Sequence, residues 1–219
     1  MNALKRRVRA FAQPQEGEPR RLPFGVGRGI TLSGDPSLSL DLWFGFFESE
    51  LGPFIRESCR PGCVDIGSYD GYYALVFAKL GGAPVRTYDI NPAAQERVRR
   101  NLELNPALAG AIELRQAGVG TGEGDTVSLD DDLEGWGRVG FLKVDVEGAE
   151  DGVLAGAERV LAEDRPHVVV ETHSADLERR CAERLMGNGY RPRVVTQRRF
   201  LPQNRATEHN RWLVANGRP

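Results

Sequence analysis

The residues best suited to chemistry in this 219-residue chain are acids and one histidine that lie in or directly after short apolar runs. Asp65, Asp89 and Asp145 each occur in such a place, and Glu171 and His173 close a further run. Carboxylates bind ammonium and hydroxyl groups through hydrogen bonds, and an imidazole takes up a proton near neutral pH. These residue types predict a site that binds a polar, partly cationic ligand and contains a proton acceptor.

The sequence of the loop Gly67–Gly71 indicates which of two classes of cofactor the fold binds. A dinucleotide fold needs the pattern G-x-G-x-x-G, because backbone amides must approach a pyrophosphate closely. Here Tyr69 stands where the second glycine is needed, and the carboxylates of Asp65 and Asp70 would repel a pyrophosphate. S-adenosylmethionine has no phosphate but carries an ammonium group and a ribose diol, which Asp89 is placed to bind. The loop therefore favours S-adenosylmethionine over NAD.

The elements that must position these residues begin at about residue 61, where apolar runs alternate with helical patterns. Strands are predicted at 63–66, 85–88, 112–119, 141–145, 168–171, 194–195 and 212–214, and helices at 72–80, 92–105, 153–161 and 175–186. Such alternation gives a parallel sheet with helices on both faces. The last two strands have no helix between them, so they must pair as an antiparallel hairpin. We expect an α/β, doubly wound, Rossmann-like fold with a mostly parallel seven-stranded sheet whose last strand is antiparallel.

Ligands of open α/β sheets bind at the carboxyl ends of the strands, near the switch in strand order. We therefore expect the cofactor at these strand ends. The predicted cofactor-binding residues are Asp65, Gly67, Ser68, Tyr69, Gly71, Asp89, Ile90, Gln116, Ala117 and Asp145.

Composition and charge set limits on partners and location. The formal net charge is −2, which provides no overall field to attract phosphate backbones, so we expect no nucleic-acid partner. No apolar run approaches the ~20 residues of a membrane span, and a cytoplasmic protein without membrane contact is expected. Residues 1–58 are less regular than the rest and are predicted to form a cover segment over the catalytic domain at 59–219.

One stretch gives a specific family resemblance. The run K-V-D-V-E-G-A-E at Lys143–Glu150 resembles that of the FkbM-type methyltransferases. Further similar segments are Val64–Gly67, Thr126–Asp130, Val168–His173 and the glycine-aromatic-glutamate segment Gly45–Glu48. The resemblance covers roughly residues 40–175. One departure is Ser68-Tyr69, where the family usually has alanine-asparagine.

The resemblance implies a class I methyltransferase fold, with S-adenosylmethionine as the cofactor and Glu48 as a further cofactor-binding residue. It also implies O-methylation of a hydroxyl on a sugar or another small secondary metabolite. A small-molecule hydroxyl acceptor is therefore expected.

The catalytic residues are predicted to be Asp145, His173 and Glu171. His173 is the candidate general base, and strand alternation places Glu171 on the same side, where its carboxylate can orient the ring. Asp145, Glu171 and His173 could instead hold a divalent cation. Their spacing in the sequence is not that of a metal motif, so no metal is expected.

Two alternative functions stay open from the sequence: an NAD-dependent oxidoreductase, and a module that binds S-adenosylmethionine without turnover. The polar connection between Gln197 and Asn210, with Asn204, is either a solvated loop or a segment that selects the acceptor. His209 is a weaker candidate for the base than His173.

Overall fold

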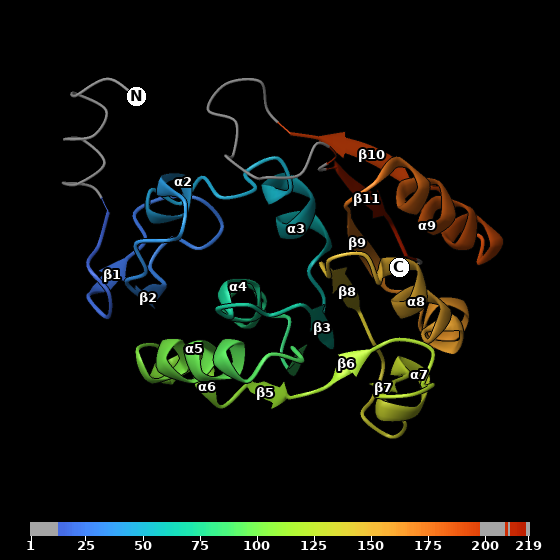
Figure 1. Ribbon diagram of the computed structural model, residues 1–219, viewed down its shortest axis with the longest axis horizontal. Helices are drawn as coiled ribbons and strands as arrows, with labels where there is room; N and C mark the ends of the chain where they lie inside the picture. Colours follow the sequence, from blue (N-terminus) through green and yellow to red (C-terminus); the bar gives the residue numbers. More distant parts are fainter. Residues whose placement is uncertain (1–12, 198–208, 210, 218–219) are drawn as a thin grey trace.

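The computed structural model describes residues 13–197, 209 and 211–217 (Figure 1). Its main sheet has seven strands in the order β10-β11-β9-β8-β3-β4-β5. The strands are β3 (Cys63–Ile66), β4 (Val85–Tyr88), β5 (Ile112–Arg115), β8 (Phe141–Val144), β9 (His167–Thr172), β10 (Arg193–Thr196) and β11 (Arg211–Ala215). β11 runs antiparallel to β9 and β10, and the pairs from β9 to β5 are parallel. The predicted doubly wound sheet with its reversed last strand is confirmed.

Helices cover both faces of this sheet (Figure 1). They are α4 (Tyr72–Lys79), α5 (Pro92–Glu103), α6 (Pro106–Ala109), α7 (Leu129–Asp132), α8 (Glu150–Ala155), the π-helix η1 (Val160–Asp164) and α9 (Ala175–Gly187). Successive residues of β9 point to opposite faces, so Val169 joins the core under α4 while Val168 and Val170 join the core under α8 and α9. Both faces of β9 are covered, and its middle residues, Val168–Val170, are accordingly apolar.

The helix starts follow local capping chemistry. Asn91 accepts a hydrogen bond from the Ala93 amide at the start of α5, with Pro92 in the first turn, and Ser174 accepts one from the Leu177 amide at the start of α9. These caps satisfy amides that have no partner within their helices. The chain therefore enters both helices directly after the ends of β4 and β9.

Two predicted elements are divided in the structure. The strand predicted at 112–119 ends at Arg115, and Gly118–Val119 form a separate strand, β6, that pairs with β7 (Thr126–Val127). The helix predicted at 153–161 is interrupted at Gly156, where a side chain would overlap the backbone of Gly120. The close approach of these two backbones displaces the chain from regular geometry.

The N-terminal part contributes a hairpin of β1 (Pro19–Arg21) and β2 (Thr31–Ser33), followed by α2 (Leu40–Trp43) and α3 (Gly52–Ser58). Its apolar residues share one core with α4. Asn101 of α5 and Asn105, which precedes α6, accept hydrogen bonds from the amides of Ser33 and Thr31, so the hairpin is fixed to the α5–α6 segment. None of the helices in the described part of the chain is long and apolar enough to cross a membrane.

Candidate active site

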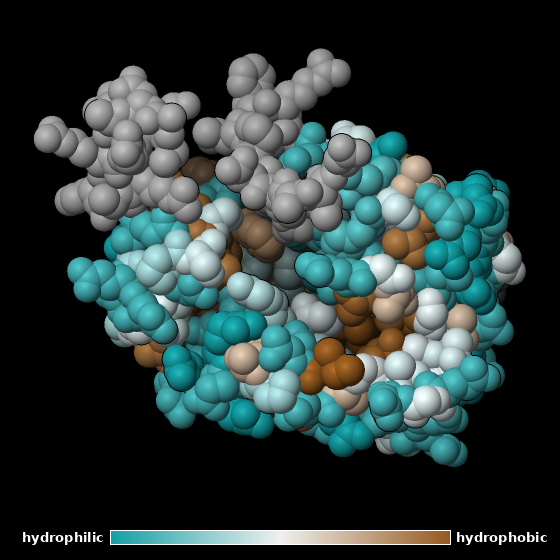
Figure 2. Space-filling view, viewed as in Figure 1, coloured by the Kyte–Doolittle hydropathy of each residue, from teal (hydrophilic) through white to brown (hydrophobic). Residues whose placement is uncertain are grey.

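A cavity of about 880 Å³ opens at the carboxyl ends of β3, β4 and β8. Leu42 and Phe47 of the N-terminal part and His173 after β9 close its sides. In the view of Figure 1 the molecular surface is hollowed near its middle, with hydrophobic side chains at the rim of the hollow (Figure 2). This volume lies in the range of ligand-binding pockets.

The cavity gathers most of the predicted cofactor residues. Asp65, Gly67, Ser68, Tyr69, Asp89, Ile90, Ala117 and Asp145 line it. Glu48, Gly71, Gln116 and Glu171 are not among its lining residues. Glu48 is nevertheless buried close by, where its Oε2 accepts a hydrogen bond from the hydroxyl of Tyr73, a lining residue.

The first loop is fixed in a strained conformation beside the cavity. Gly67 has a φ of 87°, and a side chain there would overlap the carbonyl oxygen of Asp145. Tyr69 has a φ of 48°, which is uncommon for a residue other than glycine. Its amide donates to Asp89 Oδ2 at 3.0 Å, and the guanidinium of Arg97 lies 4.4 Å from the centre of its ring. The loop therefore presents its backbone to the cavity at a defined position.

Asp89 is already engaged by the backbone on both oxygens. Oδ2 accepts from Tyr69 and Oδ1 accepts from the Asn91 amide at 2.8 Å. Each carboxylate oxygen has a second lone pair, so both can still accept hydrogen bonds from a ribose diol. The two backbone contacts fix the orientation of the carboxylate.

Asp65 carries an unsatisfied acceptor. The residue is completely buried, its Oδ2 accepts from Thr87 Oγ1 at 3.1 Å, and its Oδ1 has no hydrogen-bond partner within the described residues. Burial raises the pKa of Asp65 to about 6, although Lys143 and Thr87 oppose this. A buried acceptor without a donor is costly. An ammonium group in the cavity would satisfy it.

Lys143 is a buried cation in the cavity lining that the sequence did not single out. It is 1% exposed, and its Nζ lies 3.0 Å from Asp145 Oδ2 and 4.0 Å from Asp65 Oδ1. Burial favours the neutral amine, but the carboxylates of Asp145 and Asp65 outweigh it and raise the pKa of Lys143 above its usual value. The side chain is a fixed cation, not a base. A lysine in the apolar run Phe141–Val144 was the signal that could have identified it.

His173 has a different orienting partner from the one predicted. Its Nδ1 is hydrogen-bonded to Glu150 Oε1, while its Nε2 lies 3.8 Å from Glu171 Oε1, too far for a hydrogen bond. Glu171 Oε2 instead accepts from Trp212 Nε1 at 3.2 Å. The prediction that Glu171 orients the ring is therefore corrected to Glu150, because α8 brings its first residue against the end of β9.

The electrostatic surroundings of His173 are acidic. The hydrogen bond to Glu150 raises the pKa of His173, burial opposes it, and the charges of Glu150, Asp145 and Glu147 raise it further. The imidazolium form is therefore stabilised beside the cavity.

Asp145, Glu171 and His173 do come together in the structure. Each offers one ligand atom, and these atoms lie within 4.8 Å of one another. The ammonium of Lys143 already supplies a positive charge at Asp145. The expectation that no metal is needed stays a prediction.

The remaining predicted residues lie elsewhere. His209 Nε2 is 3.2 Å from Glu178 Oε2 on α9, and neither residue lines the cavity. His167 begins β9, at the opposite end of the strand from His173, and its Nδ1 lies 3.3 Å from Asn216 Oδ1. Asn204 lies outside the described residues.

Comparison with known proteins shows similarity to one family. A family model described as the methyltransferase FkbM domain matches residues 123–213. A methyltransferase FkbM structure from Methylobacillus flagellatus is 16% identical with a TM-score of 0.60, covering 80% of this chain and 52% of that chain. This chain thus spans about half the length of that relative. The two findings confirm the resemblance predicted from the Lys143–Glu150 run.

Other similar proteins act on macromolecules. A tRNA (uracil-54, C5)-methyltransferase of Pyrococcus abyssi, in complex with S-adenosyl-L-homocysteine, is 19% identical with a TM-score of 0.59, covering 92% of this chain and 44% of that chain. A ribosomal protein L11 methylase of Lactobacillus delbrueckii subsp. bulgaricus is 17% identical with a TM-score of 0.55, covering 80% of each chain. Among curated proteins, the ribosomal protein L11 methyltransferase of Bacillus cytotoxicus is 36% identical over 53 residues, which is 23% of this chain and 17% of that protein.

These similarities correct one expectation. The prediction of a small-molecule acceptor, with nucleic acid excluded, is wrong, because proteins of the same fold carry names of tRNA and ribosomal-protein methyltransferases. The exclusion rested on the net charge, which sums over the whole chain and does not describe the surface around one cavity.

Proposed function

We propose that this chain, whose residues 123–213 match a methyltransferase FkbM domain, transfers a methyl group from S-adenosylmethionine to a hydroxyl oxygen. The observation that carries the proposal is the cavity at the strand ends, where a buried Asp65 oxygen lacks a donor and Asp89 is held by two backbone amides. These acceptors fit the ammonium and the ribose diol of this cofactor and do not fit a pyrophosphate.

The cofactor residues divide by chemistry. Asp65 binds the ammonium group, Asp89 binds the ribose hydroxyls, and the backbone of Gly67–Gly71 runs beside the cofactor. Ile90 and Ala117 line the cavity with apolar surface suited to the adenine ring. Glu48, Gly71 and Gln116 act from outside the lining, by fixing the residues that touch the cofactor.

The chain's own part in the reaction is alignment and proton transfer. When bound, S-adenosylmethionine supplies a methyl group on a sulfonium centre. Asp145, held by Lys143, positions the acceptor hydroxyl, and Glu171, held by Trp212, supports the site from outside the cavity lining. His173 lines the cavity, and its Nε2 accepts the hydroxyl proton.

Calorimetry and turnover test this proposal. We expect S-adenosylhomocysteine to bind the full chain and NAD not to bind. Methyl transfer from a labelled donor is then measured with three acceptor pools: hydroxylated small molecules, RNA and ribosomal proteins. NAD binding without S-adenosylhomocysteine binding would refute the cofactor. Binding without transfer to any pool would favour a module that holds the cofactor without turnover.

A further inference from the structure

Glu150 is a buried acid that the sequence reasoning did not use. It is the first residue of α8 and is completely buried. Its Oε1 bonds to His173 Nδ1, and its Oε2 has no hydrogen-bond partner within the described residues. Burying a carboxylate away from water is expensive unless it is paired. The imidazole of His173 is therefore the group that makes this burial tolerable.

The contact decides which ring nitrogen carries hydrogen. An ionised carboxylate can only accept hydrogen bonds, so His173 Nδ1 must be the donor. In the neutral ring the lone pair then lies on Nε2. His173 lines the cavity, and its Nε2 is not hydrogen-bonded to Glu171, 3.8 Å away. The lone pair is thus available to a hydroxyl group in the cavity.

We propose that Glu150 is the positioning residue for the general base: it holds His173 as the Nδ1–H tautomer, directs Nε2 at the acceptor hydroxyl and stabilises the imidazolium once the proton has moved. This inference rests on the proposed methyl transfer for its catalytic meaning. In the transfer step the hydroxyl O–H bond breaks, its proton goes to Nε2, and the oxygen forms the new bond to the methyl carbon as the carbon–sulfur bond breaks.

Four acids face His173 from three neighbouring segments. Glu150 comes from α8, Asp145 and Glu147 from the segment after β8, and Glu171 from β9. The N-terminus of α9, which begins at Ala175, carries a partial positive charge and therefore opposes the effect of these acids on the pKa of His173. Of these groups only Glu150 is hydrogen-bonded to the ring. Replacing Glu150 must therefore change the ring more than replacing any other acid.

Nitrogen-15 NMR of the histidine side chains tests the proposal directly. The chain has three histidines, so the His173 signals can be assigned with a His173→Asn variant. In the unmodified chain we expect the Nδ1–H tautomer. In Glu150→Gln we expect the pKa of His173 to fall by about one unit or more, as loss of an adjacent opposite charge does. The matched control is Asp151→Asn, the next residue of α8, which contacts Arg180 and Arg184.

Turnover gives the second readout. Because the neutral ring is the active form, the rate rises with pH through the pKa of His173. Glu150→Gln should move that rise to lower pH and reduce the plateau kcat by about 10–100-fold, with S-adenosylhomocysteine affinity unchanged. Glu150→Asp should restore part of the plateau, and Asp151→Asn should retain the original profile.

Each outcome decides the proposal. An Nε2–H tautomer in the unmodified chain, or a His173 titration that Glu150→Gln leaves unchanged, overturns it. If Glu150→Gln does not fold, the tautomer of the unmodified chain and the Glu150→Asp titration decide instead. Absence of turnover in every protein would refute the proposed methyl transfer, whereas the NMR measurement would still test the pair.

Discussion

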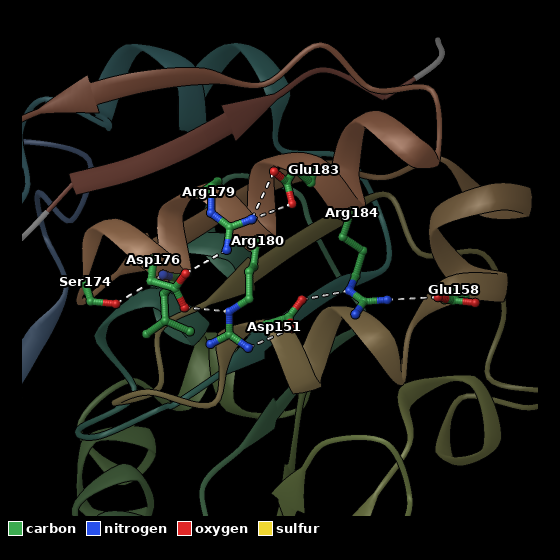
Figure 3. A network of polar contacts seen from close by, with 9 residues as sticks. Asp151, Glu158, Ser174, Asp176, Arg179, Arg180, Glu183 and Arg184 are labelled. Atoms are coloured by element: carbon green, nitrogen blue, oxygen red, sulfur yellow. Dashed lines mark hydrogen bonds and ion pairs between the residues drawn. The ribbon is translucent and has the colours of Figure 1, made fainter.

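Glu150 and Asp151 are consecutive acids in the first turn of α8, yet they enter two different polar clusters. Glu150 faces inward and bonds His173, within the cluster that also contains Lys143. Asp151 faces α9 and pairs with Arg180 and Arg184 (Figure 3). Two residues of similar chemistry, one position apart, therefore have different partners, because the helix turns Glu150 toward His173 and Asp151 toward α9.

The cluster around Asp151 is an alternating network of opposite charges between the α8 segment and α9, half-buried at Arg184 and Asp151 and exposed at its other members. Arg184 contacts Asp151 at 2.9 Å and Glu158 at 3.0 Å, and Arg180 also contacts Asp176 at 3.0 Å (Figure 3). Water and salt screen such contacts, so each contributes only ~0–1 kcal/mol. In the buried cluster, removal of one partner leaves an uncompensated charge. The comparison predicts large, chemically specific effects in one region and small, additive effects in the other.

The largest effect is expected at the centre of the buried cluster. His173→Ala should lower turnover by ~10²-fold or more, because the proton acceptor is lost, while S-adenosylhomocysteine affinity stays the same. Steady-state kinetics and calorimetry measure the two quantities. His167→Ala is the matched control and should retain turnover, since this histidine lies at the other end of β9. Equal turnover in both variants would remove His173 from the mechanism.

The next effect concerns the cofactor. Asp89→Ala should weaken S-adenosylhomocysteine binding by roughly 1.5–3 kcal/mol, because a charged acceptor for the ribose diol is lost. Calorimetry measures the change. Glu163→Ala, which removes an exposed acid on η1, serves as control. An affinity for Asp89→Ala equal to that of the control would contradict the ribose assignment.

A smaller, pH-dependent effect is expected from the titration of Asp65. Burial raises the pKa of Asp65 from 3.8 to about 6, so the folded chain holds this proton more tightly than the unfolded chain. The associated stability is complete below about pH 4 and is lost as pH rises through 6. Cofactor binding has the opposite requirement, because only the ionised carboxylate attracts an ammonium group.

S-adenosylhomocysteine affinity should therefore fall as pH decreases through about 6, as measured by calorimetry at several pH values. Asp65→Asn should bind more weakly at pH 8 and show a flatter profile. An unchanged slope in this variant would mean that another group, such as Asp70, governs the pH dependence.

The smallest effect is expected in the charge network between the α8 segment and α9. Arg184→Met should reduce the free energy of unfolding by about 0.5–1 kcal/mol, since two screened contacts are lost. Urea unfolding at low and high salt measures it, and the difference should shrink at high salt. Turnover should be unchanged. A decrease in the free energy of unfolding as large as that expected for a buried ion pair would show that these contacts are not screened by solvent.

The sequence determined the sheet and the edge of the sheet that carries the site. Apolar runs and caps predicted the seven strands of the main sheet, because the strand and helix periods are visible in neighbouring residues. The strand-end rule then placed Asp65, Tyr69, Asp89 and Asp145 at one cavity. The predicted boundaries of helices and strands were wrong where two backbones distant in sequence meet, as at Gly156 and Gly120.

Only the tertiary structure decided which side chains touch. Strand alternation indicated Glu171 as the partner of His173, but the packing of α8 against the end of β9 places Glu150 at the ring. The sequence shows Lys143 only as one residue of an apolar strand, whereas the fold places it between Asp65 and Asp145. A local pattern fixes the face on which a residue lies. Hydrogen bonds between elements form over a few ångströms, and those distances are set by how whole helices pack on the sheet.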